Sequence, residues 1–400
     1  MVTVANVLPR AAPRRLSIFG STGSIGCNTV DLIERNPGAF AVEALTANGN
    51  VALLVDQAKR LRARVAVVAD SSRYGELKEA LSGTGIEAAG GEDAVAEAAE
   101  RPADWVMAAI VGAAGLRPTL AAARRGAVVA LANKECLICA GELMIDEIRR
   151  HGATLLPVDS EHSAIFQVFD FDQPDKVARI ILTASGGPFR SLTRQQMSAV
   201  TPAQAVAHPN WSMGAKISVD SATMMNKGLE TIEAYHLFPV AKESIDILVH
   251  PQSVVHSLVE YVDGSVLAQL GTPDMRTPIA FALGWPARMA APSPRLRLEE
   301  IGSLTFEAPD PERFPALKLA KQALHMGGAA PTVLNAANEV AVQGFLQGRV
   351  SFLDIARIVE ETLERAPPAR LNTLADVADA DSWARRYATE KVNRIGNRPN

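Results

Sequence analysis

Short apolar segments alternate with helix-like segments through the first 160 residues, and this alternation is the strongest constraint on the fold. The apolar runs cover residues 16–19, 41–47, 65–69, 105–110, 127–132 and 154–158. Strands that alternate with helices assemble into a parallel sheet, because each helix crosses back over the sheet before the next strand begins. The sequence therefore predicts an α/β fold that begins with a doubly wound parallel sheet.

The bulk composition describes a chain of several domains with a small-molecule partner. Its 400 residues exceed what one core usually organises, and 48% hydrophobic residues suffice to fill two or three. The net charge of -4 gives no reason to expect nucleic acid or an anionic membrane as a partner. Because no apolar run is long enough to span a bilayer and residues 1–15 lack the apolar core of a secretory signal, we expect a cytoplasmic protein.

A glycine turn follows the first apolar run. Residues 20–26 read GSTGSIG, and a helix-like segment comes next. Such a turn lets the backbone approach a pyrophosphate, whose negative charge the helix N-terminus favours. The G-x-x-G-x-x-G spacing differs from the commoner G-x-G-x-x-G, so an ordinary turn that binds no nucleotide is the alternative.

The end of the second apolar run bears on which dinucleotide would bind. An acidic residue there normally holds the ribose 2′-hydroxyl of NAD, but this chain reads Ala47-Asn48-Gly49-Asn50. The missing carboxylate favours NADP over NAD. No basic residue stands there either, and the nearest are Lys59, Arg60 and Arg62.

Two acids follow the run at residues 154–158. In an extended chain Asp159 and Glu161 would point the same way, and their repulsion would be relieved by a shared cation or proton. With Glu230 they would form an all-oxygen set that suits Mg²⁺ or Mn²⁺ better than zinc. The alternative is a solvated turn or a helix N-cap.

Further polar groups gather at other expected strand ends and in one later stretch. Lys134 closes the strand before the two acids, so it would lie at the same edge of the sheet. A strand leading into Ser185-Gly-Gly offers backbone N–H groups to a phosphate, although it is also ordinary turn chemistry. The stretch 208–230 joins a polar loop to a helix on which Asn226, Lys227 and Glu230 share one face.

Two remaining features of the sequence have no assigned role in binding or catalysis. Cys136 and Cys139 form a lone CxxC without a second ligand pair, so a redox or zinc role is the minor alternative to a structural one. After a Pro-rich segment at residues 285–294, helices are expected near residues 314–326, 331–347, 351–364 and 374–387.

Taken together, these motifs resemble the 1-deoxy-D-xylulose 5-phosphate reductoisomerase family over most of the chain. The motifs that carry the resemblance are GSTGSIG at 20–26, ANKE at 132–135, VDSEHSAIFQ at 158–167, ASGGPFR at 184–190 and the stretch from His208 to Glu230. The resemblance implies a Rossmann-like NADPH-binding domain (1–160), an α+β catalytic and dimerisation domain (161–290), a linker (291–312) and a C-terminal α-helical domain (313–400). It also implies a homodimer.

The resemblance further implies roles for individual residues. The divalent metal (Mg²⁺, Mn²⁺ or Co²⁺) would be bound by Asp159, Glu161 and Glu230. The phosphorylated sugar substrate would be bound by Lys134, Ser160, Glu161, Ser185, His208, Trp211, Met213, Ser221, Asn226, Lys227 and Glu230, of which Lys134, Glu161 and His208 would be catalytic. NADPH would be bound by Gly20, Thr22, Gly23, Ser24, Ile25, Gly49, Asn50, Asn133, Glu135 and Gly214. One departure from the family pattern is Gly49, because many relatives carry a basic residue there.

The reaction that the resemblance implies is a metal-assisted rearrangement followed by reduction with NADPH, in isoprenoid precursor biosynthesis. The segment 207–216 would act as a lid, with Trp211 over the substrate. Two alternatives stay open. One is a simple NADP-dependent dehydrogenase of a phosphorylated aldehyde, which needs no metal, and the other is a non-catalytic NADPH-binding module.

Overall fold

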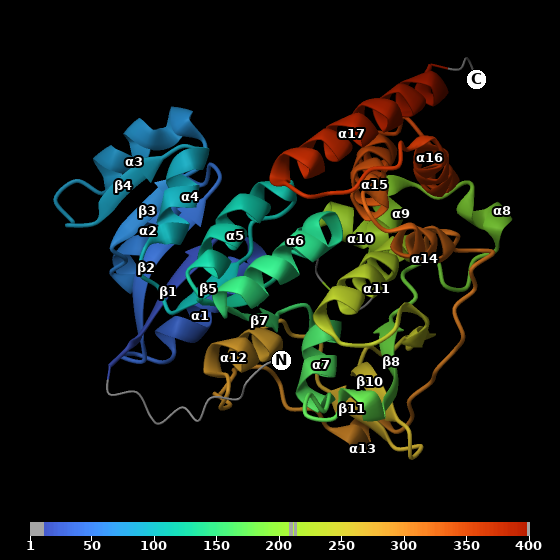
Figure 1. Ribbon diagram of the computed structural model, residues 1–400, viewed down its shortest axis with the longest axis horizontal. Coiled ribbons are helices and arrows are strands. Elements are labelled where there is room, and N and C mark those ends of the chain that lie inside the picture. The colour runs from blue at the N-terminus through green and yellow to red at the C-terminus, as the bar shows by residue number, and fades with distance from the viewer. Residues whose placement is uncertain (1–11, 208–210, 212–213, 398–400) are drawn as a thin grey trace. The chain divides into compact units, whose positions relative to one another are not determined.

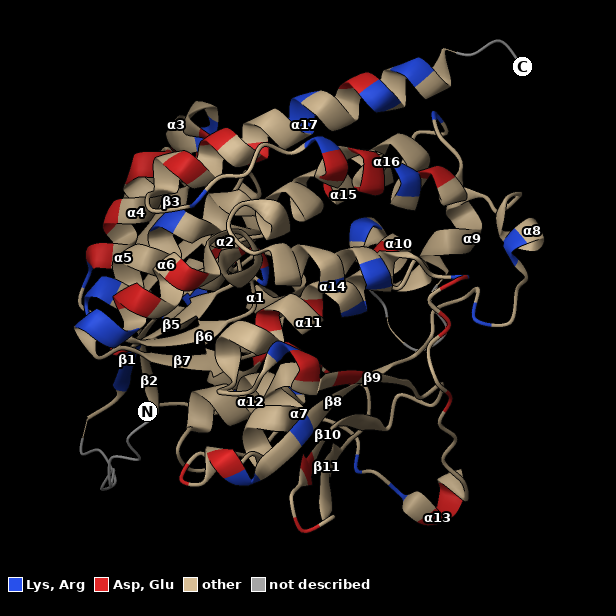
Figure 2. Cartoon of the chain, turned by 45° about the vertical axis from the view of Figure 1, so that its right-hand side comes forward, with Lys and Arg blue, Asp and Glu red and all other residues tan. Residues whose placement is uncertain are grey.

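A computed structural model describes residues 12–207, 211 and 214–397 (Figure 1). The chain divides into two compact units, each built on a sheet of its own. Lys and Arg intermix with Asp and Glu along the helices of the chain (Figure 2), as the nearly balanced composition suggests.

The sheet of the first unit has seven parallel strands in the order β4-β3-β2-β1-β5-β6-β7. The strands are β1 (Arg14–Phe19), β2 (Phe40–Ala47), β3 (Val65–Val68), β4 (Glu87–Gly90), β5 (Trp105–Ala108), β6 (Val128–Leu131) and β7 (Thr154–Pro157). The order reverses direction at β1, which pairs with β2 on one side and β5 on the other. A ligand of such a sheet binds outside the carboxyl ends of the strands at this point.

Helices and short 3₁₀ turns connect these strands. They are α1 (Ser24–Glu34), α2 (Val51–Leu61), η1 (Ser71–Arg73), α3 (Tyr74–Ala80), α4 (Glu92–Glu100), η2 (Ala113–Gly115), α5 (Leu116–Arg124) and α6 (Glu135–His151). Most strand residues are buried, as in β1, where Leu16 and Ile18 have no exposed surface. This explains why the strands read as continuous apolar runs, since a parallel sheet covered by helices has no solvent-facing side.

A later segment of the chain, Asp274–Pro294, also belongs to the first unit. Its helix α12 (Arg276–Gly284) packs on α1. The indole Nε1 of Trp105 donates to the carbonyl of Ala282 at 3.0 Å, and Arg14 donates to the carbonyl of Leu283 at 2.7 Å. These bonds join a segment that is distant in sequence to the centre of the sheet.

The second unit contains a four-stranded mixed sheet in the order β11-β10-β8-β9. Its strands are β8 (Val177–Ala184), β9 (Ile245–Val249), β10 (Val255–Tyr261) and β11 (Val266–Leu270). Strand β8 runs parallel to β9 and antiparallel to β10, and β10 forms a hairpin with β11.

Shorter helices precede or follow these strands. They are α7 (Ser160–Val168), η3 (Pro174–Lys176), α8 (Arg194–Met197), α9 (Pro202–Val206), α10 (Ala215–Ala222), α11 (Met225–Leu237), η4 (Lys242–Ser244) and α13 (Leu298–Ile301).

The C-terminal helices form the core of the second unit together with α11. They are α14 (Ala316–Met326), α15 (Ala330–Leu346), α16 (Phe352–Arg365) and α17 (Leu374–Gly396). Helix α15 is buried around most of its circumference, and both α16 and α17 pack on it (Figure 1). Helix α14 packs on α11, where a Cβ at Gly228 would lie 2.6 Å from the Cβ of Ala320. This glycine lets the two helices approach closely and so fixes α11.

The fold class is confirmed, including the parallel sheet, the α+β region and the C-terminal helices. Strand β4 was not expected, because its sequence Glu-Ala-Ala-Gly has low strand propensity. Helix α17 extends nine residues beyond the predicted end at Tyr387, to Gly396. The assignment of functions to the domain ranges stays a prediction. None of the helices in the described ranges has the length and apolar character that a membrane-spanning helix needs.

The glycine turn yields a stability prediction. A Cβ on Gly26 would lie 2.3 Å from the carbonyl oxygen of Gly20, and backbone atoms cannot move away as a flexible side chain can. We expect Gly26→Ala to lower the free energy of unfolding by about 1–3 kcal/mol or more. The control is Gly75→Ala in α3, where a Cβ meets nothing within 4 Å and helix propensity favours alanine by up to about 1 kcal/mol. Thermal melting that shows equal midpoints for both variants would refute the prediction.

Candidate functional site

The glycine turn lies between β1 and α1, at the centre of the parallel sheet. Gly20 has φ 83°, and a Cβ added at this position would lie 2.6 Å from the carbonyl oxygen of Ala109. Gly23 is the N-cap of α1, with no side-chain cap and no acidic residue in the first turn. Thr22 and Ile25 are half-buried, and Gly23 and Ser24 are exposed. The first N–H groups of α1 therefore have no side-chain cap, and their contact with an anionic group of a ligand stays a prediction.

The end of β2 lies next to this turn in the sheet. Asn50 is the N-cap of α2, and its side chain accepts a hydrogen bond from the Leu53 N–H at 3.2 Å. Gly49 precedes it, and the side chain nearest to a Cβ at this position is that of Asp70.

The corner between β6 and α6 contains Asn133, Lys134 and Glu135. Asn133 is buried, and its amide donates to the carbonyls of Ile110 and Gly112, the second at 2.9 Å. Its Oδ1 accepts the Glu135 N–H at 2.9 Å. Asn133 therefore fixes this corner of the sheet, a structural contribution that the sequence did not indicate. Its role and that of Glu135 toward NADPH stay predictions.

Asp159 follows β7 at the same edge of the sheet. Lys134 Nζ lies 3.2 Å from Asp159 Oδ2, so the two neighbouring strand ends do bring these residues together. The expected extended chain at Asp159–Glu161 is wrong, because Ser160–Val168 forms helix α7. Asp159 instead accepts the Glu161 N–H at 3.2 Å, and the Ser160 hydroxyl donates to the Glu161 carboxylate. The helical turn keeps both carboxylates close to one another.

The loop after β8 and the end of α10 come together in the second unit. Gly186 and Gly187 have φ 82° and 67°, and the Gly187 N–H donates to the Ser185 hydroxyl at 3.2 Å. A Cβ at Gly187 would lie 2.7 Å from the Ser221 carbonyl oxygen. Ser185 and Ser221, which are 36 positions apart in the sequence, therefore lie in adjoining segments.

Helix α11 begins directly after Met224, whose φ of 63° makes a tight turn from α10. Asn226 and Lys227 both donate to the carboxylate of Glu230, as their predicted common face requires. Lys227 and Glu230 are buried, with 4% and 1% of their surface exposed. A buried lysine and carboxylate need this pairing, because either charge alone would be costly to desolvate.

Part of the predicted lid can be described. His208 and Met213 lie outside the described residues. Trp211 lies with its ring centroid 6.3 Å from that of His256 in β10, and Gly214 is the N-cap of α10. Burial lowers the pKa of His256 to about 4, so this imidazole is neutral at pH 7.

Two groups of metal-ligand side chains occur among the described residues. One comprises Asp159, Glu161 and Glu230, and each offers a carboxylate oxygen within 4.8 Å of the others. Oxygen-only donors at this separation fit a hard divalent cation such as Mg²⁺ or Mn²⁺.

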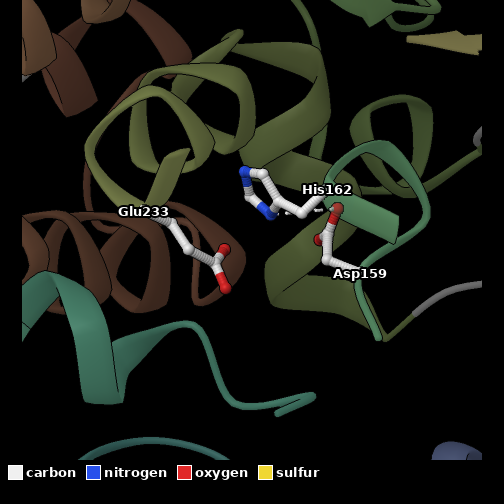
Figure 3. A group of neighbouring side chains, drawn as sticks. All are labelled: Asp159, His162 and Glu233. Atoms are coloured by element: carbon white, nitrogen blue, oxygen red, sulfur yellow. Dashed lines mark ion pairs between the residues drawn. The ribbon is translucent and has the colours of Figure 1, made fainter. Parts of the chain in front are cut away.

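The second group shares Asp159 and adds His162 and Glu233, with ligand atoms again within 4.8 Å of one another (Figure 3). The His162 Nδ1 lies 3.7 Å from Asp159 Oδ1. His162 and Glu233 are buried. The sequence offered one signal for them: each stands three residues after a predicted metal ligand, which is one helical turn.

The CxxC residues are buried helix residues. The Thr332 hydroxyl donates to the carbonyl of Cys139 at 3.0 Å, and the Asn335 amide lies 3.7 Å from its sulfur. Neither ligand group found in the described part of the chain includes a cysteine. The structure gives Cys139 a packing role in α6.

A glycine turn at the centre of a doubly wound sheet, with carboxylates and a lysine at neighbouring strand ends, is typical of the dinucleotide-binding class of α/β proteins, here with an acidic group of the kind that binds metals. Residues 16–141 match the sequence family described as 1-deoxy-D-xylulose 5-phosphate reductoisomerase, and residues 155–238 and 270–387 match two C-terminal domains of that enzyme. The chain belongs to the 1-deoxy-D-xylulose 5-phosphate reductoisomerase family, which confirms the resemblance inferred from its motifs.

Individual relatives agree with this assignment. The chain is 67% identical over 394 residues to the reductoisomerase of Rhodospirillum centenum, which covers 97% of this chain and 98% of that protein. It is 61% identical to the reductoisomerase of Zymomonas mobilis, over 96% of this chain and 99% of that one.

Solved structures of reductoisomerases share the fold. The Zymomonas mobilis enzyme in complex with NADPH superposes with a TM-score of 0.92 at 58% identity, over 95% of this chain and 99% of that one. A reductoisomerase in complex with NADPH, fosmidomycin and magnesium gives 0.91 at 42% identity, over 96% of this chain and 100% of that one.

Proposed function

We propose that this chain is an enzyme that converts 1-deoxy-D-xylulose 5-phosphate into 2-C-methyl-D-erythritol 4-phosphate, using NADPH and a divalent metal ion. The observation that carries the proposal is the group formed by Asp159, Glu161 and Glu230 in a chain that also has the dinucleotide-type glycine turn. A simple dehydrogenase needs no such group of acids, and a binding module needs neither the acids nor Lys134. The solved relatives with NADPH and with magnesium support the same choice of cofactors.

The residues that would hold the metal are Asp159, Glu161 and Glu230. A divalent cation held by them would supply a Lewis acid for the carbonyl and hydroxyl oxygens of the substrate. Lys134 adds a positive charge 3.2 Å from Asp159, where it can offset negative charge that develops on the substrate. Glu161, whose carboxylate accepts the Ser160 hydroxyl, is the proposed group for moving protons beside the reacting carbons.

The phosphate of the substrate would be held by Ser185, Ser221, Asn226 and Lys227. The Ser185 loop contains two glycines with positive φ, a backbone geometry that suits an anion. Lys227 supplies a buried positive charge. Binding energy from this remote group can orient the sugar phosphate for the rearrangement.

The lid role of residues 207–216 stays part of the proposal. Within this segment, Trp211 lies close to the neutral His256 of β10, and Gly214 is the N-cap of α10. The described part of the segment therefore contacts β10 and continues into α10. Closure over the substrate would exclude water from the proposed aldehyde, 2-C-methyl-D-erythrose 4-phosphate, until it is reduced. His208 and Met213 are proposed to contact the substrate from this segment.

We further propose a cytoplasmic homodimer. Strand β11 is the edge of the mixed sheet, and Val266 and Leu267 on it are about half exposed. An exposed apolar edge strand is a natural surface for pairing with a second copy. Sedimentation equilibrium should give twice the mass of the 42.5 kDa chain, and the mass of a single chain would refute the dimer.

The proposed reaction has a direct test. In a mixture of purified protein, NADPH and 1-deoxy-D-xylulose 5-phosphate, the absorbance of NADPH should fall only when Mg²⁺ or Mn²⁺ is present. Oxidation of NADPH that persists in excess chelator would favour the simple dehydrogenase. Binding of NADPH without any substrate-dependent oxidation would favour the binding module.

The metal ligands have a separate test that does not depend on turnover. We expect Glu230→Gln to weaken Mn²⁺ binding, measured by electron paramagnetic resonance, by at least about tenfold, because even indirect partners of ligands contribute 10–100-fold. The control is Glu43→Gln, which removes another buried carboxylate, one paired with Arg101 at 2.9 Å. That variant should lose stability and keep its Mn²⁺ affinity. Equal affinities in the wild type and Glu230→Gln would remove Glu230 from the site.

A further inference from the structure

Asp70 places a carboxylate beside Gly49, at the end of β2. Strands β2 and β3 continue to pair beyond their ends, with Ala69 N–H donating to Ala47 at 2.8 Å and Asp70 N–H donating to Asn48 at 3.0 Å. A Cβ on Gly49 would lie 3.9 Å from Asp70 Oδ2, the nearest atom in the described residues apart from Gly49 itself and its two chain neighbours. The carboxylate that β2 lacks at its end is therefore supplied by β3.

The Asp70 side chain is held in one position and is ionised. Its Oδ1 accepts the N–H of Ser72 at 3.0 Å and the Ser72 hydroxyl at 2.6 Å. These hydrogen bonds lower the pKa of Asp70 below its ordinary value, so the group is negative at neutral pH. The side chain is exposed, which leaves it accessible to a bound nucleotide.

Arg73 also contributes to the lowered pKa of Asp70, but Arg73 and Arg60 are each paired with other carboxylates. Arg73 pairs with Glu76 at 2.7 Å, and Arg60 pairs with Glu34 and Asp56. Lys59, Arg60 and Arg62, the nearest basic residues after the end of β2 in the sequence, lie at the C-terminal end of α2. That end is about 15 Å from Asn50 at the usual rise of a helix, too far to reach a group beside Gly49.

We propose that Asp70 faces the 2′-position of the adenosine ribose and reduces the selectivity of this enzyme for NADPH over NADH. A carboxylate at this place in a doubly wound sheet accepts a hydrogen bond from a ribose 2′-hydroxyl and repels a 2′-phosphate. NADPH still binds through the glycine turn and the N-terminus of α1, so the effect is on the preference between the two dinucleotides. The inference rests on the proposed NADPH-dependent function.

The test compares binding of both dinucleotides, followed by nicotinamide fluorescence, so no turnover is needed. Asp70→Asn keeps an oxygen that can accept the Ser72 N–H but removes the charge. We expect NADPH to bind about three- to tenfold more tightly to this variant, the effect of removing a charge a few ångströms away in solvent. NADH should bind no more tightly than before, and the gain for NADPH should shrink at high salt.

A second variant and a matched control complete the design. Gly49→Lys, whose Cβ has ordinary room, should raise the NADPH preference further than Asp70→Asn does. The control is Asp263→Asn in the β10–β11 turn, where an exposed aspartate makes the same contact with the residue two positions on, at 2.9 Å to the Ser265 N–H. Its dinucleotide preference should equal that of the wild type.

The outcomes separate the inference from the function on which it rests. If both dinucleotides bind the wild type and Asp70→Asn leaves their affinity ratio within twofold, Asp70 has no part in selectivity. If the wild type binds neither dinucleotide, the proposed function fails, and the inference fails with it.

Discussion

Repulsion between neighbouring carboxylates is the constraint on which the site depends. Asp159, Glu161 and Glu230 bring three oxygens within 4.8 Å of one another, and Glu230 has only 1% of its surface exposed. Three ionised carboxylates this close together are stable only when positive charge lies next to them. The protein supplies part of it through Lys134 beside Asp159 and Lys227 beside Glu230. In the proposed function, a divalent cation would supply the rest, and the rearrangement would use the same positive charge.

Several packing features serve to hold these groups in place. The Asn133 side chain fixes the loop after β5 and the start of α6. It therefore determines the position of the Lys134 backbone. Helix α11 is fixed by its close contact with α14 at Gly228, and by the tight turn at Met224. The C-terminal helices therefore contribute to the site indirectly, because they support the helix that carries Asn226, Lys227 and Glu230. A rigid support of this kind is what precise ligand geometry requires.

Much of the fold could be predicted because its signals are local. Buried parallel strands appear as apolar runs, and the glycine turn after β1 appears as three glycines between an apolar run and a helix-like segment. Strand β4 was missed since its Glu-Ala-Ala-Gly sequence has no strand preference and gains its partner only from β3. Helix α7 was missed at its start because acids two apart after a strand fit an extended chain as well as a helix N-terminus. The joining of Asp274–Pro294 to the first unit depends on contacts with distant residues such as Trp105.

In the site, too, local relations could be predicted and contacts between separate elements could not. Pairs on one helix face, such as Lys227 and Glu230, follow from spacing alone. The roles of Gly49 and Asp70 do not, because they stand on different strands and meet only when β2 and β3 pair. His162 and Glu233 were visible as residues, but a single sequence does not show that they lie close to Asp159. Relations across elements thus needed the structure.

Anomalous diffraction from crystals grown with Mn²⁺ would test the central claim most directly. The account predicts one strong manganese peak with oxygens of Asp159, Glu161 and Glu230 as its protein ligands. A peak bound elsewhere, or no peak near these three carboxylates at saturating Mn²⁺, would contradict it.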